Sequence, residues 1–208
     1  MDSNTRTDKS FKNLASFSKE ILVCCPHCSK RASVISKFSQ YYVPHPMRED
    51  TTSKFQCNNC YKPLDEKYWR GPIIISPAAA KCGHCGNKLK DEKRLVNKYQ
   101  SKMKVKCSAC GQDRYYETKY EFTYSNSNQA TDPYLGLPLW LQVPIDTNIL
   151  WAYNFEHLNY LKEYVAAKLR QAVEGGKHSL AWKLPNFIKI AKNRDKILRA
   201  IERLEKKV

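Results

Sequence analysis

Eight of the nine cysteines form four Cys-x-x-Cys pairs, a spacing suited to metal binding. A two-residue gap lets the chain turn tightly and present two sulfurs to one tetrahedral ion. Each pair supplies half a site, so four pairs predict two closed four-cysteine sites that hold structural Zn2+ ions. Because a closed site leaves no coordination position for a substrate, we expect these ions to stabilise the fold and to do no chemistry. The predicted ligands are Cys25, Cys28, Cys57, Cys60, Cys82, Cys85, Cys107 and Cys110.

The residues around these pairs are those of metal-binding knuckles. Gly86 and Gly111 each follow the second cysteine of a pair, where a positive φ is easily reached by glycine. Pro26 and Gly83 lie inside pairs, where turn residues are expected. These positions favour zinc-ribbon turns.

Redox chemistry is the alternative for the Cys82 pair, because disulfide isomerases use the same four letters, CGHC. In those enzymes the first cysteine begins a helix that lowers its pKa. Here Cys82 follows three alanines and a lysine, no aromatic residue precedes it, and Gly86 and Asn87 follow the pair. This context suits a turn better than a helix start, so we prefer the metal site.

Sequence order does not by itself settle which pairs share an ion. Sequential pairing places the first two pairs on one ion and the last two on the other, whereas interleaved pairing is found in cross-brace modules. We prefer sequential pairing because the intervals contain strand-like segments that can fold back locally, at residues 32–38 and 104–106. A further strand-like segment follows the last pair, at residues 115–124.

The ninth cysteine and the histidines lie outside this ligand set. Cys24 has three open interpretations: a competitor of Cys25 for metal, a buried apolar residue, or a reactive thiol. His27, His45 and His84 are expected to be bystanders, since eight cysteines already complete two sites. An odd cysteine count without a secretory signal also argues against a disulfide framework.

The chain is strongly basic, with a formal charge of +16. Two zinc ions with eight thiolates lower this charge to about +12. Such a charge attracts polyanions, either nucleic acid or an acidic partner, although it can also serve solubility alone. No stretch approaches the length of a membrane span, and residues 1–10 lack the apolar core of a secretory signal. We therefore expect a soluble cytoplasmic protein with no membrane partner.

Composition and periodicity predict an α+β fold in four segments. Residues 1–20 form a flexible lead-in or short helix, residues 21–124 a double zinc-ribbon region of small antiparallel strands, and residues 125–133 a polar linker or exposed loop. Residues 134–208 form a strand–strand–helix unit, or β-hairpin plus helices, that ends in basic helices.

The last segment carries clear secondary-structure signals. We predict strands at residues 139–143 and 149–153, then a helix capped by Asn154 that runs to about Glu174 and ends at Gly175-Gly176. Trp140 and Trp151 are expected to pack on the apolar stripe of this helix rather than to serve as a stacking platform. A further helix capped by Asn193 is predicted to span residues 192–208.

Two basic regions are candidate phosphate-binding surfaces. The stretch from Lys88 to Lys106 has the densest positive charge in the chain, and the C-terminal helix carries a basic stripe. A solvated loop and a solvated helix face are the simpler interpretations. The candidate nucleic-acid-binding residues are Lys88, Lys90, Lys93, Arg94, Lys98, Lys102, Lys104, Lys106, Lys192, Lys196, Arg199 and Arg203.

The segments CCPHC, FQCNNC, KCGHCG and KCSACG resemble the knuckles of transcription-factor-IIB-type zinc ribbons. The segments DPYLGLPLWLQ, LWAYNFEHL and LPNFIKIAKNRDKILRAI resemble bacterial and phage zinc-ribbon proteins whose function is not settled. The resemblance implies metal binding by the eight cysteines and a nucleic-acid or protein-scaffold role. It implies no catalytic residue.

These observations support one leading function and one alternative. The leading hypothesis is a zinc-binding nucleic-acid-binding protein or accessory subunit that contacts the phosphate backbone without sequence preference. The alternative is a protein–protein interaction module: an adaptor, an inhibitor or a defence-type partner. We expect no enzyme, because the acidic residues are scattered and none shows the spacing of a catalytic metal site.

Overall fold

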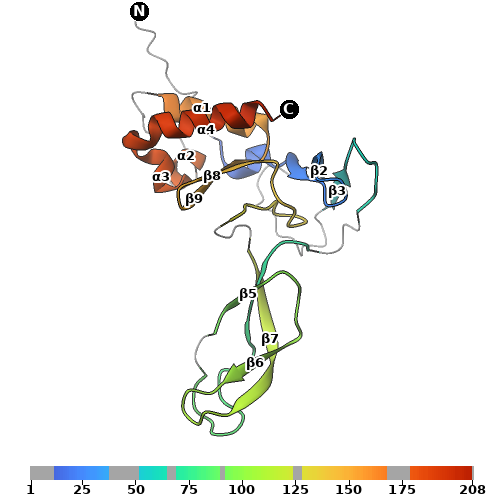
Figure 1. The fold of residues 1–208 in the computed structure, drawn as a ribbon, viewed down its shortest axis with the longest axis vertical. Helices are drawn as coiled ribbons and strands as arrows, with labels where there is room; N and C mark the ends of the chain where they lie inside the picture. The colour runs from blue at the N-terminus through green and yellow to red at the C-terminus, as the bar shows by residue number, and fades with distance from the viewer. Residues whose placement is uncertain are drawn as a thin grey trace, which may run out of the picture. The chain divides into compact units, whose positions relative to one another are not determined.

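The computed structural model describes residues 12–37, 52–64, 69–89, 92–123, 128–167 and 179–207. Contacts divide the chain into two compact units: unit 1 comprises Met1–Trp69 and Ser127–Val208, and unit 2 comprises Arg70–Asn126. Unit 2 is thus inserted into the sequence of unit 1, and this division cuts across the predicted region 21–124. The fold is α+β with antiparallel sheets, as predicted (Figure 1).

Unit 1 begins with a three-stranded antiparallel sheet. Its strands are β1 (Glu20–Cys24), β2 (Arg31–Lys37) and β3 (Thr52–Gln56), in the order β1-β2-β3. Alternation along these strands turns Val23, Val34 and Phe55 into the protein interior. The opposite face carries Leu22, Ser33 and Gln56, which are register neighbours across the three strands.

The C-terminal part of unit 1 is a hairpin followed by helices. The elements are η1 (Leu14–Phe17), β8 (Leu141–Ile145), β9 (Asn148–Ala152), α1 (Phe155–Ala166), α2 (Leu180–Lys183), α3 (Asn186–Lys189), η3 (Ala191–Asn193) and α4 (Arg194–Glu205). Asn154 caps α1 as predicted, since its side chain accepts a hydrogen bond from His157 N at 2.9 Å.

Two predicted helix details are corrected. Helix α1 ends at Ala166, because Ala167 leaves helical geometry with a ψ of 124°, so the helix does not run on to Glu174. The predicted stop at residues 175–176 lies outside the described residues. Asn193 precedes α4, but its side chain donates to Phe187 O at 2.9 Å and makes no capping bond. No helix among the described residues is long and apolar enough to cross a membrane.

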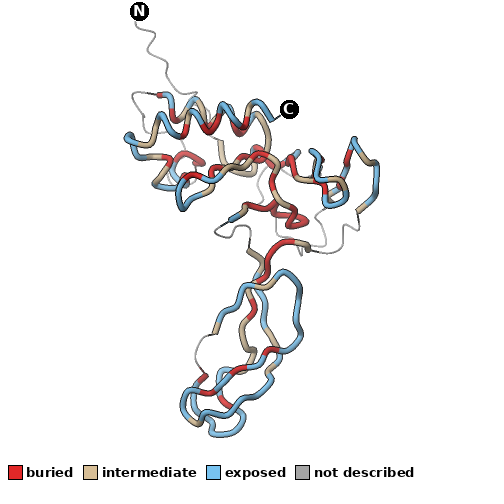
Figure 2. Tube along the Cα trace, viewed as in Figure 1, coloured by how far each residue is buried: buried red, intermediate tan, exposed pale blue. Residues whose placement is uncertain are grey.

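One hydrophobic core joins the first sheet to the C-terminal helices. Helices α1 and α4 lie side by side in Figure 1, and both contain buried positions, coloured red in Figure 2. Their buried side chains in this core include Leu158, Leu161 and Ile201. The outer edge of β1 is paired as well: Trp140 N donates to Leu22 O at 2.9 Å. The first sheet and the C-terminal half therefore fold as one body.

Unit 2 is a separate four-stranded antiparallel sheet. Its strands are β4 (Ile73–Pro77), β5 (Arg94–Val96), β6 (Lys102–Lys106) and β7 (Asp113–Phe122), in the order β5-β4-β7-β6. Its buried apolar residues are few: Ile73, Ile75, Cys82, Leu89, Met103, Val105 and Cys107.

Candidate metal centres

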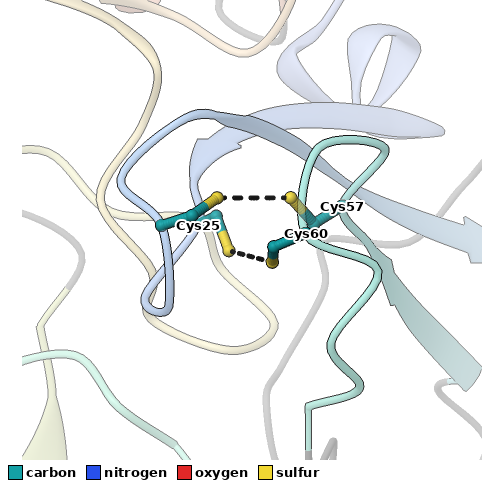
Figure 3. A group of neighbouring side chains, drawn as sticks. Cys25, Cys57 and Cys60 are labelled. Atoms are coloured by element: carbon teal, nitrogen blue, oxygen red, sulfur yellow. Dashed lines mark hydrogen bonds between the residues drawn. The ribbon is translucent and has the colours of Figure 1, made fainter.

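The eight predicted ligands lie in two groups of four, paired in sequence order. The first group is Cys25, Cys28, Cys57 and Cys60, and the second group is Cys82, Cys85, Cys107 and Cys110. Within each group all four sulfurs lie within 4.8 Å of one another. Figure 3 shows the first group, where sulfurs converge from the turn between β1 and β2 and from the turn after β3.

The distances between sulfurs fit a tetrahedral ion. In the first group the Sγ atoms of Cys25 and Cys60 lie 3.7 Å apart, and so do those of Cys28 and Cys57. In the second group the matching separations are 3.9 Å and 3.8 Å. A tetrahedron with Zn–S bonds of about 2.3 Å has edges of about 3.8 Å, whereas a disulfide requires about 2.05 Å. The groups therefore have the geometry of metal sites able to hold one ion each.

Backbone hydrogen bonds shape each knuckle in the same way. The first cysteine accepts at its carbonyl from the N–H four residues later, at 2.9 Å for both Cys82 and Cys107. The residue at that fourth position takes a positive φ: Gly86 has 71° and Gly111 has 73°, as predicted from the glycines. In the first group Ser29 (φ 58°) and Tyr61 (φ 55°) adopt the same conformation without glycine.

Hydrogen bonds in the knuckle turns favour the thiolate, the metal-binding form of cysteine, at Cys82 and Cys57. N–H groups of Cys85 and His84 donate to the Cys82 sulfur and lower the pKa of its thiol to about 6. At Cys57 burial opposes ionisation, but N–H groups of Cys60 and Asn59 lower the pKa to about 6. Each group thus contains a sulfur prepared to lose its proton to a metal.

The surroundings of the two groups differ. Cys25 and Cys57 belong to the hydrophobic core of unit 1, and their two partners pack against it. In the second group Cys82 and Cys107 are buried within unit 2, but Cys85 is exposed. The first group is therefore supported by a large core and the second by a small one.

Among the described residues, Cys24, His27 and His84 do not belong to either cysteine group. Cys24 is half-buried, its thiol lies 3.8 Å from Leu139 O, and burial raises its pKa. These features describe a packed thiol rather than a reactive one. The ring of His27 bonds to Pro63 O at 3.2 Å, and His84 is exposed; His45 lies outside the described residues.

A fifth turn in unit 1 has the backbone of a knuckle but no cysteine. Asp132 N donates to Leu137 O, and Gly136 N donates to Asp132 O, which repeats the bonds around Cys25 and Cys82. Gly136 has a φ of 69°, and residues 131 and 138 pair as 81 and 88 do. Asp132 therefore occupies the position of a first cysteine, with Leu135 in the position of the second.

The Asp132 carboxylate replaces the metal-bound sulfur in this turn. It is fully buried and accepts three backbone hydrogen bonds, from Tyr134 N and Leu135 N at its Oδ1 and from Leu137 N at its Oδ2. Burial raises the pKa of Asp132 to about 6, although the three donors oppose that shift. Its polar composition placed Asp132 in a predicted linker. The sequence signal that could have identified the turn is the D-P-x-x-G pattern that begins at Asp132, which parallels the C-P-x-C-S pattern that begins at Cys25.

The predicted basic stretch lies largely on the sheet of unit 2. All its described members are exposed: Lys88, Lys93, Arg94, Lys98, Lys102, Lys104 and Lys106. Several are paired with carboxylates, which the sequence analysis did not anticipate. Two of these ion pairs join β6 to β7, Lys102–Glu117 at 3.6 Å and Lys104–Asp113 at 2.9 Å. Lys90 lies outside the described residues.

Two further cations of this stretch are also paired: Lys93 with Glu121 at 3.9 Å, and Arg94 with Glu92 at 2.7 Å. The predicted C-terminal cations Lys192, Lys196, Arg199 and Arg203 are exposed as well. Of these four, Lys196 forms an ion pair with Asp146. The candidate surface is therefore less uniformly positive than composition suggested.

Comparisons with models of protein families, with curated proteins and with solved structures find no match to this chain. The cysteine groups are compatible with zinc-ribbon knuckles on their geometry alone.

Proposed function

We propose that each cysteine group binds one Zn2+ ion and that both ions are structural. The sulfur separations of 3.7–3.9 Å support a tetrahedral thiolate site, and zinc is the usual occupant of closed sites made of four cysteines. Because four sulfurs leave no open position, neither ion is assigned a catalytic role. Elemental analysis of the purified chain is expected to find two zinc atoms per chain, and stoichiometric iron would contradict the assignment.

We further propose that the zinc-stabilised scaffold binds nucleic acid through unit 2. The observation that carries this is the exposure of Tyr115 (70% exposed) next to its register partner Lys104. Because side chains alternate along a strand, Lys102 and Lys106 share that face. An exposed aromatic ring flanked by lysines suits base stacking together with phosphate contact.

The ion pairs on this face are compatible with phosphate binding. They are exposed pairs, which contribute little to stability and are screened by salt, so phosphates can compete for the same lysines. Lys88, Lys98 and Lys106 have no ion pair among the described residues. Unit 2 as a whole has twelve Lys and Arg against five Asp and Glu.

Fluorescence anisotropy with labelled single-stranded and duplex DNA tests this proposal. We expect binding that weakens steeply between about 50 and 200 mM salt. Substitution Tyr115→Ala is expected to weaken binding to the single strand about fivefold or more. Tyr120→Ala is the matched control, since Tyr120 lies on the opposite face of the same strand. Absence of binding to DNA and RNA at low salt would rule the proposal out.

A protein-interaction module is the second candidate, and it uses that opposite face. Tyr99 and Tyr120 are 54% and 41% exposed, and their rings meet edge to face at 5.2 Å. Exposed aromatic side chains are frequent anchors of protein interfaces. A stoichiometric partner recovered after nuclease treatment, and lost with Tyr99→Ala but not Tyr115→Ala, would favour this candidate.

A further inference from the structure

A groove of about 620 Å³ lies on unit 1, on the face of the first sheet that points away from the core. Leu22, Ser33 and Gln56, which are register neighbours on that face, all line it. Its volume is in the range of sites that hold a small organic molecule or one residue of a polymer. None of the predicted site residues lines it.

Two half-buried aromatic side chains contribute to the groove, Trp140 and Phe155. Trp140 is held in place, because its Nε1 donates to Lys207 O at 2.9 Å and Lys207 Nζ donates to Trp140 O at 2.9 Å. Phe155 is the first residue of α1, next to the capping residue Asn154. Lys207 Nζ lies over one face of the Trp140 ring, 5.1 Å from its centroid, so a planar ring would stack on the other face of this held indole.

The charges around the groove favour an anion. Lys30 and Arg31 line it, and neither forms an ion pair among the described residues. Its one carboxylate, on Glu20, already accepts a hydrogen bond from Ser33 Oγ at 2.7 Å. Two adjacent uncompensated cations are suited to one phosphate group.

Three side-chain amides give the groove both donors and acceptors. They belong to Gln56, Asn58 and Asn59, and Gln56 Nε2 donates to Asn58 Oδ1 at 2.9 Å. Asn58 and Asn59 are the two residues between Cys57 and Cys60, so the ion of the first group would fix their positions. Amides in a fixed position can pair with the exposed edge of a base.

We propose that this groove binds one nucleotide of a single-stranded nucleic acid, with its base against Trp140 and Phe155 and its phosphate at Lys30 and Arg31. The proposal rests on the proposed nucleic-acid function and adds a second, single-strand-specific contact to it. A single strand is specified because a paired base presents its faces to its neighbours and its edge to its partner, and neither is then open to the groove.

The test uses the full zinc-loaded chain and fluorescein-labelled dT12 in an anisotropy titration, with the same sequence as a duplex for comparison. Trp140→Ala is expected to weaken dT12 binding about 5- to 100-fold while the duplex is affected less. Arg31→Ala is expected to weaken it and to lower the slope of log affinity against log salt by about 1. Lys183→Ala, an exposed lysine of unit 1 outside the groove, is the matched control and should bind as the unmodified chain does.

Because Trp140 also contacts Lys207, a conservative variant separates binding from folding. Trp140→Phe keeps a stacking ring, so we expect affinity for dT12 within about threefold of the unmodified chain. We expect dT12 to quench part of the tryptophan emission of the unmodified chain through Trp140, and this quenching should disappear in Trp140→Phe. Zinc content and the thermal unfolding curve of each variant establish that unit 1 is intact.

The outcomes distinguish the two proposals. Binding that depends on Tyr115 but is unchanged by Trp140→Ala and Arg31→Ala would overturn the groove and leave the proposed function standing. Absence of binding to any nucleic acid would overturn both. Equal losses of dT12 and duplex binding in Trp140→Ala would also overturn the single-strand assignment.

Discussion

The two cysteine groups have the same sulfur geometry but stand in different surroundings. The first group is built into the core of unit 1, where the sheet β1–β3 shares buried apolar residues with α1 and α4. The second group closes one small sheet that has few buried residues of its own. One type of four-cysteine group thus occurs in two settings, within an existing core in unit 1 and in place of a larger core in unit 2.

Because of this difference, we expect the folding of the two units to depend on metal to different degrees. A small domain buries too little apolar surface to offset its conformational entropy, and a metal supplies the deficit. Unit 2 is such a domain, so its folding is expected to require its ion. Unit 1 has a much larger core, so we expect that core to persist without metal and metal loss there to be a local event.

The largest expected effect is that of removing one ligand from each group. Cys82→Ser should lose one zinc equivalent and unfold unit 2, because apparent binding energies of structural zinc, about 10–16 kcal/mol, exceed the stability of a small domain. Cys25→Ser should also lose one equivalent, yet keep the helices of unit 1. Elemental analysis and backbone amide NMR spectra of the two variants measure this. A Cys82→Ser chain that keeps both ions and a folded unit 2 would contradict the expected dependence of unit 2 on its ion.

The second effect comes from the core of unit 1. Ile201 is fully buried in α4, and Ile201→Ala should destabilise unit 1 by about 2–5 kcal/mol through the cavity it leaves. All four tryptophans belong to unit 1, so their fluorescence reports its unfolding alone. The first metal group should become easier to strip with a chelator, since it is embedded in that core. If metal at the second group also became easier to strip in Ile201→Ala, the two units would not be independent.

A smaller effect is expected at the metal-free turn. In Asp132→Asn an amide NH2 replaces Oδ2, so that a donor faces Leu137 N–H and one buried hydrogen bond is lost. We expect a destabilisation of unit 1 of about 1–3 kcal/mol in thermal or urea unfolding. Gln129→Ala, a nearby half-buried position, serves as the control. An unchanged midpoint for Asp132→Asn would show that the carboxylate does not hold the turn.

The smallest effect is a pH dependence confined to unit 1. Burial lowers the pKa of His157 to about 3, and the ring stacks on Phe17 at 4.8 Å. In the unfolded chain the His157 ring takes up a proton at about pH 6.5, whereas in the folded chain it does so only near pH 3. The contribution of neutral His157 to the stability of unit 1 is therefore fully present above pH 6.5 and is lost as the pH drops toward 3. The contribution of His157 to this loss should be about 1 kcal/mol between pH 7 and 5.5, and the raised pKa of Asp132 acts in the opposite direction.

His157→Gln isolates this contribution from other titrating groups. The variant cannot take up the proton, so between pH 7 and 5.5 its tryptophan-detected stability should fall by about 1 kcal/mol less than that of the unmodified chain. Unit 2, followed by amide signals, should show no difference between the two chains. Parallel pH profiles would exclude His157 as the cause.

Local chemistry explains what the sequence could predict. Cysteine spacing identified both metal groups, and the hairpin and the Asn154 cap follow from residues close together in the chain. The joining of the first sheet to the C-terminal helices depends on which buried faces meet, and periodicity does not encode that. The ion pair of Lys104 with Asp113 depends on strand register, and the exposed Tyr115 appeared in sequence only as part of a predicted strand. Likewise, a buried Asp132 looks like a polar linker residue until its three donors are seen.

The Asp132 turn has a consequence for how the protein acquires its metal in a cell. Its carboxylate is part of the chain, so we expect this turn to form at any zinc concentration, whereas the four proposed zinc knuckles should close only when ions bind. The turn leads directly into the residues that pair with β1, the strand that ends next to Cys25. We therefore expect β1, which leads into the first knuckle, to be paired before any ion arrives, while the knuckle itself closes on the ion. When zinc is scarce, the first site should fill before the second, and unit 1 should be complete while unit 2 is still unfolded.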